Sequence, residues 1–267
     1  MPWAFPTPQH CEAERMVIDG QLLDCISQAE HVVVFTGAGV SAESGIPTFR
    51  DAQTGLWTEF DAATLASPEG FRADPALVWG WYEWRRMKVL QAKPNPAHLA
   101  IAELAEMVPR LTLVTQNVDD LHERAGSDNP IHLHGRLHRP RCFACAKPFD
   151  YPPGIPEEPE GGRRLEPPRC VHCGEYIRPG VVWFGESLPE KAWQAAQQAA
   201  HYCDLLFSIG TSSLVWPAAQ LPETAARNGA AIVQINPEPT ALDRTARFNL
   251  RGKAGDILPA LLEALRK

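Results

Sequence analysis

The stretch VVVFTGAGVSAESGIPTFRD, residues 32–51, constrains the fold of this chain more than any other. It begins with four apolar residues, three of them β-branched, a pattern typical of a buried strand in a parallel sheet. Gly37 and Gly39 follow, so the backbone can turn sharply and no side chain separates its N–H groups from a ligand. A strand, a glycine turn and a polar segment in this order predict the phosphate-binding loop of a doubly wound α/β domain.

The glycine pair by itself is a weak signal, because such pairs also occur in ordinary turns. Ala42 stands where the dinucleotide fingerprint has its third glycine, which a looser form of the pattern allows, and Gly45 follows. The continuation SGIPTFRD favours the binding loop, since a plain turn needs neither a proline, an aromatic ring nor an Arg–Asp pair.

The composition is that of a soluble globular protein, with 45% hydrophobic and 21% charged residues. Its 267 residues suffice for one domain, or for one domain and a small satellite. The net charge of −7 argues against an extended nucleic-acid-binding surface. No apolar run approaches the roughly 20 residues that cross a bilayer, and the N-terminal residues resemble neither a secretory signal nor a transit peptide. We therefore expect a cytoplasmic protein without nucleic-acid or membrane partners.

Alternating strand and helix patterns organise most of the chain after a Pro-rich arm at residues 1–14. The segment 52–93 differs, because it is rich in aromatic residues and carries two helix starts, Ser67-Pro68 and Asp74-Pro75. We predict an α/β fold with a Rossmann-like parallel sheet (15–51, 94–138 and 178–267), a helical insertion (52–93) and a small module (139–177). Strands are expected at 32–35, 111–115, 131–135, 180–184, 204–210 and 231–236, and helices at 16–29, 98–107, 192–202 and 257–265.

Two cysteine pairs, Cys142-x-x-Cys145 and Cys170-x-x-Cys173, lie in the small module. Each pair supplies two thiolates from one tight turn, which is the ligand set of a tetrahedral zinc site. Four protein ligands leave no position open for water, so a structural Zn²⁺ is favoured over a catalytic one. A redox-active pair is the alternative, but it lacks a thioredoxin-like context. We predict one structural zinc per chain.

Polar side chains follow the expected strands, where ligands of open α/β sheets bind. Gln116, Asn117 and Asp119 come after the strand at 111–115, and an amide offers both a donor and an acceptor. His132 and His134 are two apart in an expected strand, so both can point toward this edge. The alternatives are an Asx turn for Asn-Val-Asp and a structural role for either histidine.

Four motifs and the cysteine pairs together resemble the sirtuins, NAD-dependent protein-lysine deacylases. The motifs are the glycine-rich stretch, TQNVDDLHERAG at 115–126, His134-Gly135 with Arg141-Cys142, and FGE at 184–186 with GTSSLV at 210–215. The resemblance covers residues 30 to 260. It implies a Rossmann-like domain that binds NAD, a zinc module that interrupts it, and release of nicotinamide and O-acyl-ADP-ribose.

The resemblance also implies roles for single residues. His134 would be the general base and Asn117 a second catalytic residue, while Phe49 would shield the reactive carbon from water. An acyl-lysine peptide would pair with two strand edges, at Val182, Phe184, Gly185, Glu186 and Val215. The residues expected to contact NAD are Gly37, Ala38, Gly39, Ala42, Glu43, Pro47, Thr48, Phe49, Arg50, Gln116, Asn117, Asp119, His134, Gly210, Thr211, Ser212, Asn236, Pro237, Glu238 and Ala254.

Tyr82 and Arg85 lie three residues apart on an expected helix and therefore on one face. A tyrosine hydroxyl and a guanidinium can clamp the carboxylate at the end of an acyl chain. The pattern Tyr-x-x-Arg and the small residue Ala66 resemble class III sirtuins, which remove succinyl, malonyl or glutaryl groups from lysine. The alternative is a core ring beside a surface arginine.

We therefore expect a monomeric NAD-dependent deacylase that removes succinyl, malonyl and also acetyl groups from lysines of protein or peptide substrates. Mono-ADP-ribosyl transfer to a protein shares the cofactor and the loss of nicotinamide, but it leaves a modified protein. A nicotinamide-dependent oxidoreductase would keep the nicotinamide attached. A non-catalytic zinc-knuckle binding module is disfavoured by the net acidity and by the polar strand ends.

Overall fold

The fold is built on a six-stranded sheet in which every neighbouring pair of strands runs parallel. The computed structural model describes residues 18–48, 60–154, 157–159 and 162–267. The spatial order β3-β2-β1-β6-β7-β8 reverses between β1 and β6, as in doubly wound dinucleotide-binding domains, where ligands bind at that switch point. The strands are β1 Val32–Thr36, β2 Leu111–Thr115, β3 Ile131–His132, β6 Leu205–Ile209, β7 Ala231–Asn236 and β8 Phe248–Arg251.

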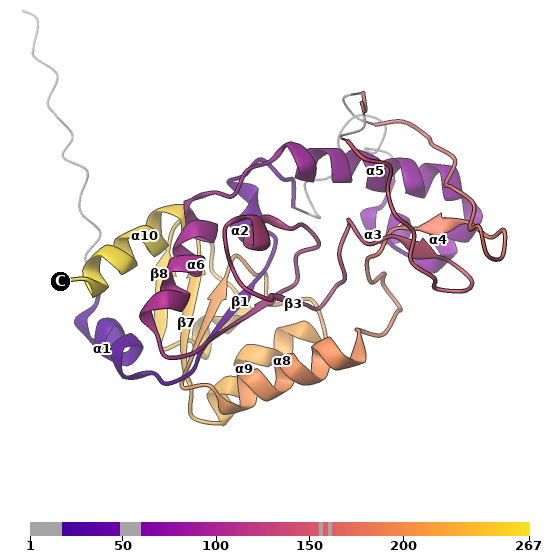
Figure 1. Ribbon diagram of the computed structural model, residues 1–267. Helices are drawn as coiled ribbons and strands as arrows, with labels where there is room; N and C mark the ends of the chain where they lie inside the picture. Colours follow the sequence, from indigo (N-terminus) through magenta and orange to yellow (C-terminus); the bar gives the residue numbers. More distant parts are fainter. Residues whose placement is uncertain (1–17, 49–59, 155–156, 160–161) are drawn as a thin grey trace, which may run out of the picture.

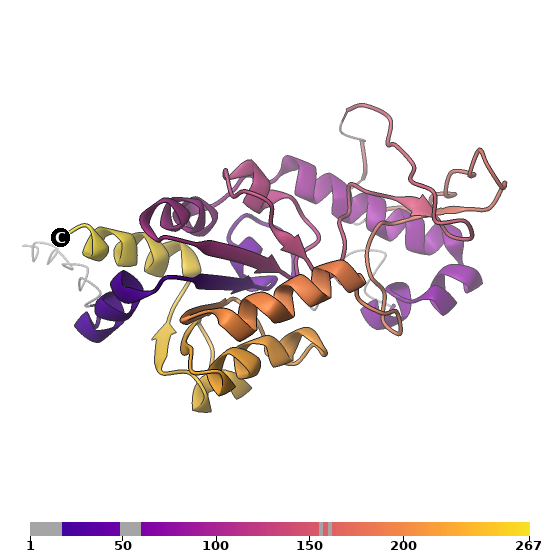
Figure 2. The same cartoon turned by 60° about the horizontal axis from the view of Figure 1, so that its bottom comes forward.

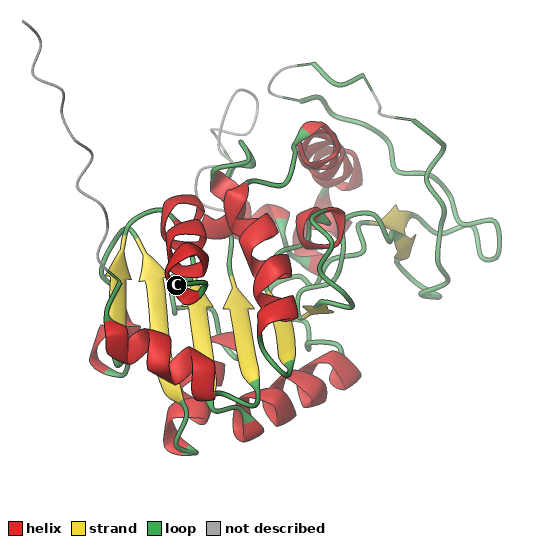
Figure 3. Ribbon diagram, turned by 60° about the vertical axis from the view of Figure 1, so that its left-hand side comes forward, coloured by secondary structure: helices red, strands yellow, loops and turns green. Residues whose placement is uncertain are grey.

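Helices cover both faces of this sheet (Figures 1, 2 and 3). All five residues of β1 are buried: Val32 and Val34 pack on one face, Val33 and Phe35 on the other. A strand that is apolar on both faces needs cover on both, so the predicted parallel α/β architecture is confirmed. One face carries α1 Gly20–Gln28, α6 Pro96–Met107 and α10 Ala254–Leu265, and the other carries α8 Glu190–Tyr202 and α9 Leu221–Arg227.

The aromatic-rich insertion folds into helices beside the carboxyl edge of the sheet (Figure 1). Its described part holds α3 Ala62–Leu65, α4 Pro68–Ala73 and α5 Pro75–Gln91. The side chains of Ser67 and Asp74 cap α4 and α5, and a proline occupies the first turn of each, as predicted. The insertion shares one apolar cluster with Leu121 and Trp183, so it is anchored to segments that follow the sheet strands.

The small module contains an antiparallel pair, β4 Arg141–Cys142 and β5 Ile177–Arg178. Its residues Cys142, Cys170 and Ile177 pack against Trp79 of α5, so module and insertion lie together at one end of the molecule (Figure 1). The remaining short elements are α2 Gly39–Ala42, α7 Leu121–Arg124, η2 Ala218–Gln220 and η3 Ala241–Arg244.

Some expected elements differ in the structure. The strand expected at 131–135 ends at His132, because the chain turns at Gly135, which has a φ of 78° and forms an isolated antiparallel bridge with Val181. The segment 180–184 makes that bridge instead of joining the main sheet, so its prediction as a strand was wrong. The edge strand β8 was missed, because its four residues alternate in polarity over too short a span. Among the described helices, none has both the length and the apolarity to cross a membrane.

Candidate active site

A cavity of about 790 Å³ opens at the carboxyl edge of the sheet, a size typical of small-molecule sites. Its walls come from the loops after β1, β2, β6 and β7, from the segment 181–188 and from the helical insertion. One cavity thus gathers most of the residues that the sequence placed at a cofactor and at a substrate. These are Gly37, Ala38, Gly39, Pro47, Thr48, Ala66, Tyr82, Arg85, Gln116, Asn117, His134, Val182, Phe184, Gly185, Glu186, Gly210, Thr211, Ser212, Val215, Asn236 and Glu238.

Two glycine loops form the floor of the cavity at the switch point. A Cβ at Gly37 would lie 2.8 Å from the carbonyl oxygen of Gly210, and Gly210 itself has a φ of 61°. Only glycine allows this approach, so the floor is bare backbone. Phosphate and ribose groups can come close to such a surface. Nearby, the Asn236 side chain donates to the Thr211 carbonyl oxygen at 2.8 Å and fixes the loop after β6.

A buried polar network stands behind the loop after β2. Asn117 Nδ2 donates to Ser41 Oγ at 3.1 Å, and Ser41 in turn donates to Asp119 Oδ2 at 3.0 Å. Burial raises the pKa of Asp119, while the hydrogen bonds from Leu121 N–H and from Ser41 favour its charged form. Asn117 and Ser41 line the cavity but Asp119 does not, so Asp119 acts on the cavity through them. Ser41 was missed by the sequence reasoning.

His134 faces the cavity and has the tautomer of a base. Its Nδ1 lies 3.0 Å from the carbonyl oxygen of Gln116. A carbonyl only accepts, so Nδ1 carries the proton and Nε2 keeps its lone pair. Burial lowers the pKa of His134 below its ordinary value, which keeps the ring neutral. His132, the other candidate, does not line the cavity: its Nε2 lies 2.8 Å from Glu123 Oε1 and its Nδ1 3.2 Å from the Asn117 carbonyl oxygen.

Some residues expected at the cofactor are not among those that line the cavity. The Glu43 carboxylate accepts a hydrogen bond from the Gly255 N–H at 3.0 Å, so it caps the start of α10. Ala42, Asp119, Pro237 and Ala254 also do not line the cavity. Phe49 and Arg50, and Asp51 beside them, lie outside the described residues.

The far end of the cavity is formed by the insertion. The Ala66 carbonyl oxygen accepts from the Phe184 N–H at 2.9 Å, which ties the insertion to the segment 181–188. Tyr82 and Arg85 of α5 line the same wall. Burial raises the pKa of Tyr82 to about 12, so the phenol stays protonated. The Arg85 guanidinium lies 4.9 Å from the ring centroid of Trp81. A phenol donor and a cation therefore face one space.

The rim of the cavity carries large apolar side chains. Phe184, Leu214, Val215 and Trp216 are all exposed and all line the opening, which suits a peptide that passes across it. Glu186, expected to touch substrate, pairs its carboxylate with Arg178 and also accepts from the Trp183 N–H. The sequence reasoning did not identify Trp216 or Trp183 as lining residues. Both tryptophans directly adjoin sequence motifs, at 184–186 and 210–215, and this position could have indicated that they line the site.

The four module cysteines converge on one point. Their Sγ atoms all lie within 4.8 Å of one another, with Cys142 and Cys173 at 3.4 Å and Cys145 and Cys170 at 3.7 Å. Four sulfurs at the usual zinc–sulfur length around a tetrahedral ion stand about 3.8 Å apart. The set therefore fits one structural Zn²⁺, as predicted.

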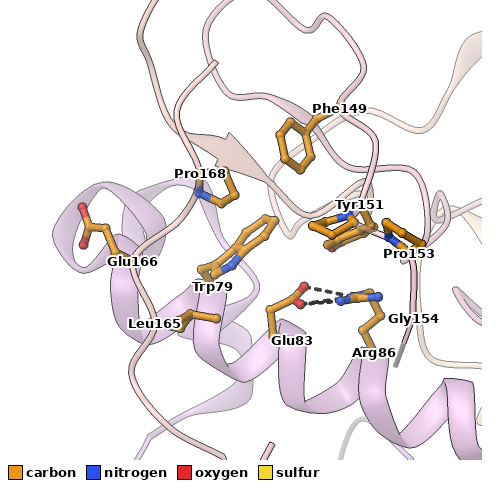
Figure 4. Close-up of a pocket in the computed structure, with 11 residues that line it drawn as sticks. Trp79, Glu83, Arg86, Phe149, Tyr151, Pro153, Gly154, Leu165, Glu166 and Pro168 are labelled. Atoms are coloured by element: carbon orange, nitrogen blue, oxygen red, sulfur yellow. Dashed lines mark hydrogen bonds and ion pairs between the residues drawn. The ribbon is translucent and has the colours of Figure 1, made fainter. Parts of the chain in front are cut away.

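A second cavity, of about 370 Å³, lies between α5 and residues of the small module, among them Phe149 and Leu165 (Figure 4). Glu83 and Arg86 form an ion pair there, with Arg86 Nη2 2.7 Å from Glu83 Oε2 and both side chains buried. The Arg86 guanidinium also lies 3.7 Å from the ring centroid of Tyr151, and Trp79 stacks near the same ring. The charges of Glu83 and Arg86 neutralise each other, so we interpret this cavity as part of the packing between α5 and the module.

Known proteins share this arrangement. An NAD-dependent protein deacylase from Methylococcus capsulatus is 69% identical over 252 residues, which cover 94% of this chain and 99% of the relative. A crystal structure of a Sir2 homolog–NAD complex matches with a TM-score of 0.84 at 46% identity, covering 94% of each chain. A Sir2 protein bound to a myristoylated histone peptide matches with a TM-score of 0.72 at 34% identity, covering 92% of this chain and 95% of that one. The Sir2 family model matches residues 37–217, which include the glycine floor, His134 and the four cysteines, and the chain therefore belongs to the Sir2 family.

Proposed function

We propose that this Sir2-family chain removes acyl groups that end in a carboxylate, such as succinyl and malonyl, from lysines of protein substrates. Family membership and the close relatives support the coarser statement, that the chain is an NAD-dependent protein deacylase. The preference for acidic acyl groups is a finer proposal. A cytoplasmic location and a monomeric state remain predictions.

The proposal rests on one observation: Tyr82 and Arg85 share a wall of the cavity that His134 also lines. A carboxylate is an acceptor-only group, and it matches a phenol O–H beside a guanidinium. The guanidinium stays charged in proteins, and its attraction for an anion is stronger in a poorly hydrated cavity than in water. A methyl group at the end of an acetyl chain gains nothing from either partner.

The cofactor fits the opposite part of the cavity. The backbone floor at Gly37, Gly39 and Gly210 can accept phosphates, while Gln116 and Asn117 present amides to a ribose or a carboxamide. When bound, NAD supplies the glycosidic bond whose cleavage drives removal of the acyl group. His134 Nε2 is placed to take a proton from a hydroxyl in this space, and burial keeps it unprotonated for that task.

The substrate backbone would lie between two segments at the rim. The Val182 N–H already donates to the His134 carbonyl oxygen at 2.8 Å, which fixes one segment against the catalytic histidine. The other segment contains Ser213, whose φ is 56°, followed by Leu214 and Val215. An extended peptide that pairs its backbone between such segments binds with little demand on its sequence.

The test compares peptides that differ only in the lysine acyl group: acetyl, succinyl and myristoyl. Purified protein is incubated with NAD and each peptide, and peptide mass is followed. We expect the highest kcat/KM for succinyl. Tyr82→Phe and Arg85→Met should each lower that value by about ten- to a hundredfold, as for loss of a hydrogen bond to a charged group. Arg72→Met is the matched control, because Arg72 is an exposed arginine of α4, outside the cavity.

Other outcomes would contradict the proposal. A higher kcat/KM for the acetyl or myristoyl peptide, unchanged by Tyr82→Phe and by Arg85→Met, would show that the chain is a general deacylase. If NAD were consumed while a protein gained mass and no peptide lost its acyl group, mono-ADP-ribosyl transfer would replace deacylation.

A further inference from the structure

We propose that Trp183 is a positioning residue for acyl recognition: it fixes the direction of the Tyr82 hydroxyl so that this group donates to the terminal carboxylate of the substrate. The inference rests on the proposed function, because it concerns how the same wall of the cavity selects an acidic acyl group. It adds to that function a residue that never needs to touch the carboxylate.

The contact between the two residues has one possible polarity. Trp183 Nε1 lies 3.0 Å from Tyr82 Oη. An indole N–H only donates, so the phenol oxygen must accept. The two rings are tilted by 40° with centroids 6.3 Å apart. Trp183 is 2% exposed and Tyr82 4%, so bulk water does not compete for this bond.

The Tyr82 hydroxyl keeps its own proton for another partner. Within the part of the chain that the structure describes, Trp183 is the hydrogen-bond partner of this hydroxyl, and it uses an oxygen lone pair. The O–H therefore points away from Trp183, and Tyr82 lines the cavity together with Arg85. Donation from the indole also polarises the hydroxyl and strengthens the bond that it donates in turn. An acceptor-only carboxylate fits this arrangement better than a group that also donates.

Contacts from the zinc module, the loop 181–186 and the insertion hold the indole in place. The Arg178 guanidinium lies 3.5 Å from the ring centroid of Trp183. Glu186 Oε2 accepts from the Trp183 backbone N–H at 2.8 Å and from Arg178 Nη2 at 2.9 Å. Phe71 of the insertion packs on the ring at 5.4 Å between centroids. The indole has little freedom to turn, so the direction of its N–H is set before a substrate arrives.

Glu186 therefore gains a role beyond the expected backbone pairing with a peptide. Its carboxylate holds Trp183 and Arg178. Arg178 belongs to β5, which pairs with the strand that contains the zinc ligand Cys142. The acyl wall thus takes its geometry from three segments: α5, the loop 181–186 and the zinc module.

The key variant is Trp183→Phe, which keeps an aromatic ring under Arg178 and removes only the indole N–H and part of the ring. Steady-state kinetics are measured with succinyl-lysine, acetyl-lysine and succinamyl-lysine peptides, the last carrying a neutral carboxamide of the same shape. We expect the succinyl KM to rise about three- to tenfold relative to the acetyl KM, with a smaller change in kcat. The ratio of the succinamyl KM to the succinyl KM should also move toward one.

A double-mutant cycle separates positioning from packing. In a Tyr82→Phe background no hydroxyl is left to direct, so Trp183→Phe should change the succinyl-to-acetyl KM ratio no further. Trp84→Phe is the matched control. Trp84, which lies in α5, is also a fully buried tryptophan, and it does not line the cavity. It should leave the ratio at the wild-type value.

The outcomes distinguish the inference from the proposed function. If Tyr82→Phe and Arg85→Met leave the succinyl KM unchanged, the proposed function fails. If those variants raise it while Trp183→Phe does not, or if Trp183→Phe adds its full effect to Tyr82→Phe, only the inference is overturned. If Trp183→Phe folds poorly, the KM values of the wild type still test the inference. Equal KM values for the succinyl and succinamyl peptides would show that the Tyr82 hydroxyl does not act as a fixed donor, and would overturn the inference.

Discussion

The backbone N–H of Gly39 and the carbonyl oxygen of Gly210 form a 2.9 Å hydrogen bond that joins the two loops at the switch point. A Cβ at Gly39 would lie 2.7 Å from Gly210 Cα, and the atoms in its way are backbone. The loops after β1 and β6 are therefore held at a spacing that only two glycines allow.

We expect Gly39→Ala to push these loops apart and to raise the KM for NAD by about tenfold or more, since small displacements in a binding site are costly. The KM is measured at saturating peptide, and thermal unfolding checks that the variant is folded. Gly20→Ala is the control, because Gly20 begins α1 with nothing within 4 Å of its Cβ position. A folded Gly39→Ala protein with an unchanged KM for NAD would contradict the close-packed floor.

Protonation of His134 should lower the rate of the reaction at acidic pH. Burial, the largest cause, lowers its pKa below the ordinary value of 6.5, while the hydrogen bond to Gln116 opposes this shift. The neutral base is present above the pKa and is lost as the pH falls through it. We expect kcat/KM to be constant near neutral pH and to decline with an apparent pKa below 6.5.

The variant His134→Gln should lower kcat by roughly 10²- to 10⁴-fold, the usual size of general-base catalysis. His138→Gln is the control, because His138 pairs with Asp120 and does not line the cavity. An acidic limb with a midpoint above 6.5, or one that survives in His134→Gln, would assign the limb to another group.

The sequence predicted much of this site because parallel strands bring their carboxyl ends to one edge. Gln116 and Asn117 follow β2 and Gly210 follows β6, yet their shared position at strand ends was enough to place them together. This prediction depends only on the direction of the strands and not on the paths of the loops between them.

Tertiary contacts explain what the sequence could not predict. Nothing in the sequence indicated that the Glu43 carboxylate accepts from the Gly255 N–H, because Gly255 lies at the start of α10, far along the chain. Trp183 and Tyr82 are likewise distant in sequence, and their hydrogen bond depends on how the insertion docks. Neither contact can be predicted from the periodicity or the residue spacing of the sequence.

The zinc site should be structural. We expect one zinc per chain by elemental analysis, and we expect its removal by a chelator to lower Tm and abolish deacylation together. Without the ion the strand pair β4–β5 loses its anchor, and Arg178 no longer holds Trp183. Cys170→Ser should do the same, whereas Cys25→Ser, on α1, should retain zinc. A zinc-free protein with full activity and an unchanged Tm would contradict this role.

Two buried histidines should make stability depend on pH. The rings of His98 and His122 pack with centroids 4.8 Å apart. Burial lowers the pKa of His98 to about 4 and that of His122 to about 3. His98 Nδ1 accepts from the Asn95 N–H at 3.3 Å, and His122 Nε2 lies 3.0 Å from Thr36 Oγ1. The folded protein therefore holds both rings neutral.

In the unfolded chain a histidine titrates near pH 6.5. Above this pH both states are neutral, so the two histidines contribute no pH dependence. Below it the unfolded state binds protons that the folded state does not, and stability is lost until the folded pKa is reached. We expect a loss on the order of 2 kcal/mol for each ring by about pH 4.5. The raised pKa of Asp119 acts in the opposite direction and offsets part of it.

Urea unfolding between about pH 7.5 and pH 4.5 measures this dependence. The comparison is between the wild type and His98→Gln, a variant without the titrating ring. The variant is less stable at neutral pH, because Asn95 loses an acceptor, but its free energy of unfolding should fall less steeply on acidification. His201→Gln is the control, since His201 is an exposed residue near the end of α8. Equal slopes in the wild type and His98→Gln would show that His98 is not held neutral by burial.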